Sequence, residues 1–124
     1  MKIVQLINPE FMAAMRRLLG QEIPGKTAFK LRGLVNKLNE QLEAFQQTRG
    51  DIMSRHCLKD EEGKAISENG NYKFSDESAA VVTAEMNELL QVEVEHATIK
   101  VDELGERFQM SAADAIVLSA VIVE

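Results

Sequence analysis

One stretch near the N-terminal end of the chain matches a motif that does chemistry. The phosphate-binding pattern G-x-x-x-x-G-K-T fits the segment Gly20-Gln21-Glu22-Ile23-Pro24-Gly25-Lys26-Thr27. In a P-loop, backbone N–H groups surround the phosphates, the lysine reaches the terminal phosphates and the threonine hydroxyl holds Mg²⁺. That site requires a buried strand before its first glycine, whereas an amphipathic segment, Phe11 to Leu19, precedes this one. We therefore interpret the segment as a linker between two helices.

The other residues that could bind a metal or act as nucleophiles are isolated. His56 and Cys57 are adjacent, but the chain has a single cysteine and only one further histidine, His96. Zinc requires about four ligands at suitable spacing, and no local signature supports Cys57 as a nucleophile with His96 as its base. We expect a buried or half-exposed thiol, and we assign no catalytic residue, cofactor or metal ligand.

Glu93 and Glu95 alternate along a segment with strand-like patterning, which places both carboxylates on one face. Paired carboxylates can do acid–base work. A solvated face or a contact between subunits is the interpretation that we prefer for them.

A long helix is the strongest structural signal in the chain. Large apolar side chains recur at alternating spacings of four and three, at Leu31, Val35, Leu38, Leu42, Phe45 and Ile52. This repeat predicts a helix from Lys26 or Thr27 to about His56 that lies nearly parallel to a partner. Arg49 interrupts the seam, and its aliphatic part can be buried while its guanidinium reaches solvent or an acidic partner. A weaker stripe in the segment 79–89 repeats the spacing and is the predicted facing surface.

The remaining pattern predicts short elements around that helix. A strand is expected over Lys2–Ile7, followed by a helix with Asn8 as its N-cap, Pro9 at its first position and Gly20 as its stop. Further along we expect a hairpin of 65–66 with 72–74 around Asn69-Gly70, then a helix that Ser75 or Asp76 caps and that extends to about Leu90 or Gln91. A strand over Val92–Val101, a turn at 102–105 and a helix from Ala112 to about Val121, capped by Ser111, should follow. The predicted fold is a single α+β domain, residues 1–124, with a long helical hairpin, a few short antiparallel strands and small flanking helices.

The charge is distributed unevenly along the chain. Residues 1–59 hold ten Lys or Arg and five acids, whereas residues 60–124 hold four and fifteen. Opposite charges of this kind favour docking of the two halves or head-to-tail assembly. Binding of nucleic acid is not expected, because the long helix does not show the required cluster of basic and aromatic residues. The N-terminus is a poor signal peptide, and no stretch has the length of a membrane span, so we expect a cytoplasmic protein with no membrane contact.

Several segments have counterparts in one known family. They are an early short helix, Leu38-Asn39-Glu40-Gln41-Leu42-Glu43-Ala44-Phe45, Lys59-Asp60-Glu61-Glu62-Gly63-Lys64, Tyr72-Lys73-Phe74, Glu85-Met86-Asn87-Glu88-Leu89-Leu90 with a Glu-Val strand after it, and Ser111-Ala112-Ala113-Asp114. In their order these parts resemble a family of small, uncharacterised proteins encoded by tailed bacteriophages. The resemblance implies the cytoplasm of the host cell as the location. It brings no catalytic residues, because none are established for the family.

Together these observations predict a non-enzymatic, bacteriophage-type accessory or virion-assembly protein. It would act through protein–protein contacts with an unidentified partner and as a homo-oligomer, with Arg49, Glu93 and Glu95 as contact residues. The first alternative is an acidic inhibitor of a host defence or nucleic-acid enzyme, in which the acidic second half imitates phosphate charge. The second alternative is a nucleotide-binding protein that uses the segment Gly20–Thr27.

Overall fold

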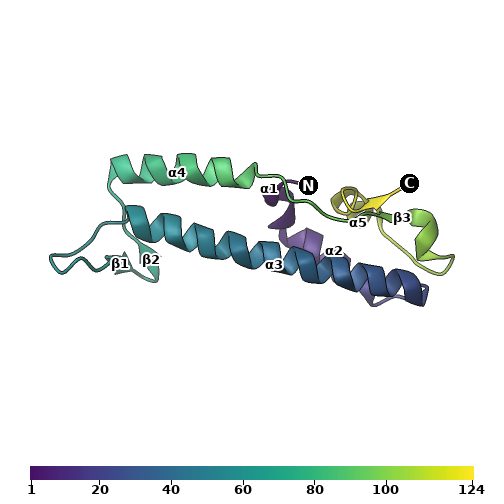
Figure 1. Ribbon diagram of the computed structural model, residues 1–124. Coiled ribbons are helices and arrows are strands. Elements are labelled where there is room, and N and C mark those ends of the chain that lie inside the picture. The colour runs from purple at the N-terminus through teal and green to yellow at the C-terminus, as the bar shows by residue number, and fades with distance from the viewer. The chain divides into compact units, whose positions relative to one another are not determined.

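The structure is a computed structural model that describes all residues, 1–124. It has an α+β fold, as the sequence predicts, in which helices dominate (Figure 1). The elements in chain order are α1 (Ile3–Leu6), α2 (Pro9–Leu19), α3 (Gly25–His56), β1 (Ser67–Glu68), β2 (Asn71–Tyr72), α4 (Asp76–Leu90), β3 (Ile99–Lys100), the 3₁₀-helix η1 (Val101–Leu104), α5 (Ala112–Val117) and β4 (Ile122–Val123). None of the helices combines the length with the apolar character that crossing a lipid bilayer requires.

The chain forms two compact units. The first comprises Met1–Leu42 with Glu93–Glu124, and the second comprises Glu43–Val92. The long helix α3 contributes its N-terminal part to the first unit and its C-terminal part to the second. The predicted helix is therefore confirmed, and its first residue lies within one or two positions of the prediction.

The apolar seam of α3 is buried, as its spacing requires. Leu31, Leu38, Phe45 and Ile52 are all buried, and Leu34 adds a further buried position. Val35 and Leu42, which border the seam, are half-buried. Thus the 3.5-residue repeat marks the side of α3 that packs in each unit.

The first unit contains the best-packed core. In α2 the residues Phe11, Ala14, Met15 and Leu18 are buried along one face, which matches the helical period. The predicted start of this helix is confirmed: Pro9 occupies its first turn, and the Asn8 side chain accepts a hydrogen bond from the backbone N–H of Glu10 at 3.0 Å. This N-cap pairs an N–H group that a helix start leaves without a partner.

Two predicted strands of the first unit are largely wrong. The segment predicted as a strand over Lys2–Ile7 is the short helix α1, in which Ile3 and Leu6 are buried three positions apart. From the segment Val92–Val101 only Ile99–Lys100 is a strand, because its partner β4 is two residues long. A strand exists only where a neighbour pairs with its backbone groups.

The C-terminal part of the first unit also differs from the prediction. Ser111 caps α5 as expected, but the helix ends at Val117 and not near Val121. The residues after it turn and bury Leu118 and Val121. Strand β4 then runs parallel to β3, so this ribbon is not antiparallel as we expected.

The second unit contains the hairpin and the second long helix. β1 and β2 are antiparallel, and the turn between them has positive φ at Asn69 (55°) and Gly70 (80°). These angles define the tight turn that an Asn-Gly pair favours, so the hairpin is confirmed with a small shift of its strands. Helix α4 is confirmed as well, with Ser75 as its N-cap. Within this unit α4 runs antiparallel to the end of α3 (Figure 1), and His56 lies 3.1 Å from Glu85 across the pair.

Candidate functional site

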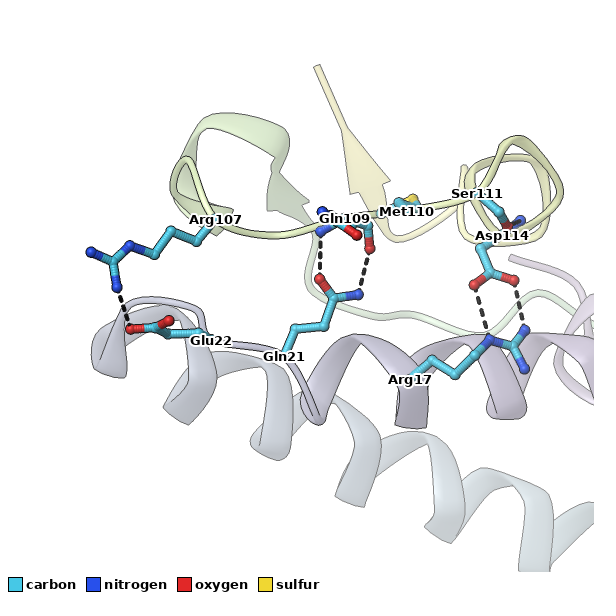
Figure 2. A pocket seen from close by; sticks show the side chains of 8 residues that line it. All are labelled: Arg17, Gln21, Glu22, Arg107, Gln109, Met110, Ser111 and Asp114. Atoms are coloured by element: carbon cyan, nitrogen blue, oxygen red, sulfur yellow. Dashed lines mark hydrogen bonds and ion pairs between the residues drawn. The ribbon is translucent and has the colours of Figure 1, made fainter.

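A polar groove of about 530 Å³ lies between the end of α2 and the segment that leads into α5 (Figure 2). Three side-chain links cross it. Arg17 donates two hydrogen bonds to the carboxylate of Asp114, at 2.6 and 3.0 Å. The Gln21 amide exchanges two hydrogen bonds with the backbone of Gln109, and Arg107 donates one to Glu22 at 2.7 Å.

The charged groups of the groove are therefore already paired with one another. The hydrogen bond from Arg17 lowers the pKa of Asp114 below its ordinary value, and the same bond raises the pKa of Arg17. A bidentate arginine–carboxylate pair fixes geometry as well as charge. These links connect segments that are far apart in the sequence, so they stabilise the fold of the first unit.

The P-loop-like segment forms the connection between two helices. It begins at Gly20, which caps α2, and ends inside the first turn of α3. Thr27 is buried, and its hydroxyl donates a hydrogen bond to the backbone carbonyl of Glu103 at 2.5 Å. A P-loop threonine instead directs its hydroxyl to Mg²⁺. In this structure Thr27 holds η1 against α3.

Lys30, one turn further along α3, contacts the same region. Its ammonium group lies 2.7 Å from the carboxylate of Glu103. This hydrogen bond and one from the backbone N–H of Lys100 lower the pKa of Glu103. The start of α3 is thus fixed to η1 by one buried and one exposed interaction.

The three predicted contact residues are all exposed, and they belong to different units. Arg49 belongs to the second unit, where it borders a small cavity of about 240 Å³ beside the hairpin residues Asn71 and Tyr72. Glu93 and Glu95 belong to the first unit, on either side of buried Val94.

The backbone of Glu93 bridges to Lys2, and its carboxylate lies 3.5 Å from the α-amino group of Met1. Exposed Glu93 and Glu95 flank buried Val94 as predicted, but Val92 is 48% exposed, so the alternation does not extend along the segment. The segment is extended without being a strand.

The histidines and the cysteine have separate local partners. Cys57 is buried, one of the two states that the sequence left open, and its thiol donates to the backbone carbonyl of Ser54 at 3.3 Å. His56 pairs with Glu85, whereas His96 lies in the other unit, with Nδ1 2.9 Å from the carbonyl of Ala97. No three His, Cys, Asp or Glu side chains gather in a way that could hold a metal ion.

The feature that sequence analysis missed is an aromatic side chain on the outer side of α3. Phe29 is 81% exposed, the largest value among the exposed large apolar residues. At about 100° per residue, it projects opposite to the seam that begins with Leu31 and Leu34. Its exposed neighbours on that side are mostly basic or small, with one acid, Glu40, at the far end: Lys26, Arg32, Gly33, Asn36, Lys37 and Glu40. A helical-wheel plot of residues 25–40 would have revealed this face, and we call it the Phe29 face.

Helix α4 has an outer side of the opposite character. Val82 is its buried residue, and Met86 and Leu89 are half-buried on the same side. On the other side, exposed small or apolar residues lie between acids: Glu77, Ala80, Val81, Ala84 and Glu88. We call these five residues the α4 acidic face. The helix contains no lysine or arginine at all.

The chain matches no protein-family model, no curated protein and no solved structure.

Proposed function

We propose that this chain is a non-enzymatic accessory protein that acts through protein–protein contacts and assembles as a homo-oligomer. The observation that carries the proposal is the exposure of Phe29, on a regular helix and opposite the buried seam. Full burial of such a side chain contributes about 1.5–3 kcal/mol. Contact with another protein would recover this free energy, and a few large anchor residues commonly carry most of the binding energy of an interface.

A second exposed apolar residue supports the proposal. Ile116 on α5 is 73% exposed in the same unit. A cavity of about 570 Å³ lies along β4 and α5, and Val101, Phe108 and Met110 contribute to its mostly apolar lining. Large apolar surface of this kind marks interaction sites when it is contiguous.

The bacteriophage-type role is the more specific part of the proposal. It rests on the resemblance of sequence segments 38–45, 59–64, 72–74, 85–90 and 111–114 to a family of tailed-bacteriophage proteins. We place the protein among accessory or virion-assembly factors, with the cytoplasm of the host cell as its site of action.

The test is the molar mass of the purified chain, measured by light scattering over a wide range of concentration. We expect a mass that rises above that of one 13.8 kDa chain as concentration increases. Replacement of Phe29 by Asp should shift this rise to higher concentration, because a charge cannot be buried without a partner. A chain that stays monomeric at every concentration would contradict the homo-oligomer.

One observation favours the alternative of an acidic inhibitor. The second unit holds ten acids and five basic residues, so it is the more acidic of the two units. An inhibitor that imitates phosphate charge would capture a nucleic-acid-binding protein, and added salt would release that protein. Recovery of such a partner by a chain that remains monomeric would favour the inhibitor over the assembly protein.

The nucleotide-binding alternative has its own test. Mg-ATP or Mg-GTP would raise the melting temperature if either nucleotide bound the native chain. The replacement Lys26→Ala would abolish that shift if the segment Gly20–Thr27 held the phosphates. We expect no shift with either nucleotide, since the Thr27 hydroxyl is already bonded to Glu103.

A further inference from the structure

We infer that the Phe29 face of one copy binds the α4 acidic face of a second copy, with the two helices antiparallel. This inference rests on the proposed homo-oligomer and identifies the surfaces that form it. The two faces belong to different compact units of the chain, so each copy can offer both.

The shapes of the two faces are complementary. Gly33 follows Phe29 by one turn, and a Cβ built on it would meet nothing within 4 Å. A glycine inside a helix lowers helix stability, and no contact of this chain explains it. The α4 acidic face has small side chains at Ala80 and Ala84, so its backbone is accessible between the acids. The Phe29 ring of one copy would pack over Ala80 and Ala84 of the other copy. Helix α4 of that second copy would in turn fill the open space at Gly33.

The charges of the two faces have the same spacing. Lys26 and Lys37 are eleven positions apart on α3, and Glu77 and Glu88 are eleven positions apart on α4. Eleven residues make three helical turns, about 16 Å, so each pair lies on one side of its helix. None of the four side chains takes part in an ion pair of the structure.

The helix ends favour the antiparallel arrangement. Lys26 lies in the first turn of α3, which holds no acid, and Glu88 lies in the last turn of α4, which holds no base. Each charge is at the end of its helix where the macrodipole disfavours it. An antiparallel pair brings Lys26 against Glu88 and Lys37 against Glu77. It sets Phe29 at the level of Glu85, next to Ala84 of the α4 acidic face. In a parallel pair, Lys26 and Glu88 would lie at opposite ends of the contact and could not pair with each other.

The experiment uses two full-length variants, Lys26→Glu and Glu88→Lys, in sedimentation velocity. Each alone should self-associate about tenfold or more weakly than the native chain, because like charges then oppose one another. Both replacements improve the match of charge to helix end, so each variant should melt at or above the native temperature. Loss of association therefore cannot be attributed to loss of folding.

Mixing the two variants is the decisive step. In a reciprocal pair, the new Glu at position 26 meets the new Lys at position 88, and the second contact retains native Lys26 and Glu88. An equimolar mixture should therefore associate about as tightly as the native chain. A mixture of Lys26→Glu with Glu77→Lys should stay weak, because the antiparallel arrangement does not pair positions 26 and 77.

Matched controls use the charged turn of the second unit. The replacements Lys64→Glu and Glu61→Lys change the net charge equally but lie outside both faces. They should leave association unchanged, alone and mixed. If they weaken it as strongly as the face variants, net charge is responsible and the inference is overturned.

The remaining outcomes separate the inference from the proposed function. Native association that none of the face variants weakens would overturn the inference and leave the homo-oligomer standing. A native chain that is always monomeric would overturn both. If Lys26→Glu removes binding to duplex DNA while Glu88→Lys leaves self-association intact, the Phe29 face is a nucleic-acid surface and the inference is wrong.

Discussion

In the unit formed by residues 1–42 and 93–124, nine large apolar side chains are less than 2% exposed, whereas the unit formed by residues 43–92 has none that is buried so completely. The buried residues of the second unit are Phe45, Ile52, Cys57 and Val82, each 7–8% exposed. Long-range polar links such as Arg17–Asp114 and Thr27–Glu103 stabilise the first unit further. A small unit with a thin core has little stability of its own, so the second unit has more to gain from contact with another chain.

The largest expected effect is the loss of unfolding free energy when a buried residue at either end of the α3 seam is replaced by Ala. Leu31 in the first unit is 0% exposed, and Ile52 in the second is 7% exposed on the same side of the same helix. Replacement by Ala should cost about 4 kcal/mol at Leu31 and about 2 kcal/mol at Ile52, the upper and lower parts of the range for such truncations. Hydrogen exchange, read separately over each unit, measures both losses. Equal losses of unfolding free energy at the two positions would contradict the difference in packing between the two units.

The next largest effect is the loss of stability when one glycine in each unit is replaced by Ala. Gly105 and Gly70 both have φ of 80°, but a Cβ on Gly105 would lie 3.1 Å from Cδ of Pro24, whereas one on Gly70 would meet nothing. Gly105→Ala should therefore cost about 2–3 kcal/mol, from backbone strain and overpacking. Gly70→Ala should cost only about 1 kcal/mol, since strain alone acts there. Thermal unfolding followed by circular dichroism measures both, and a smaller loss at Gly105 would contradict the tight packing of the first unit.

The smallest effect is the dependence of the first unit on acid. Pairing lowers the pKa of Asp114 and of Glu103, so each carboxylate contributes stability above its unfolded pKa and loses it as the pH falls through its folded pKa. The melting temperature should therefore hold between neutral pH and about pH 5 and fall below about pH 4. Asp114→Asn and Glu103→Gln should each make this fall shallower.

Glu61→Gln, in the exposed turn of the other unit, is the control and should leave the acid profile unchanged. If the Asp114 and Glu103 variants lose melting temperature in acid as steeply as the native chain, these ion pairs do not determine how its stability depends on pH.

Local signals in the sequence predicted the helices well. The Asn8 and Ser75 caps, the Gly20 stop and the heptad seam of α3 each fix an element through contacts between near neighbours, and the structure places these elements as expected. The Asn69-Gly70 turn is local too, and it fixed the hairpin. Where a few adjacent residues determine the conformation, the sequence was sufficient to predict the element.

The errors arose where a distant segment decides the conformation. The β-branched run Ile3–Val4 is helical because Ile3 and Leu6 fit a buried surface together, and no strand partner lies along it. Most of Val92–Val101 has no pairing partner either, apart from the bridge at Glu93 and the two residues of β4. Pattern alone cannot say how long a partner strand will be.

The candidate surface was recognised only in part from the sequence. Arg49, Glu93 and Glu95 were predicted as contact residues and are exposed, and their role in contacts stays a prediction. Phe29 was missed because attention to the seam ignored the opposite side of the helix. An apolar residue at an outward position becomes informative only when the buried side is known.

The most direct measurement of the central claim, that another copy covers the outer face of α4, is hydrogen exchange of residues 76–90 below and above the association midpoint. The account predicts that amide protection of α4 rises with concentration in the native chain, and that Phe29→Asp removes the rise although position 29 lies in the other unit. Protection of α4 that is the same at both concentrations would contradict it.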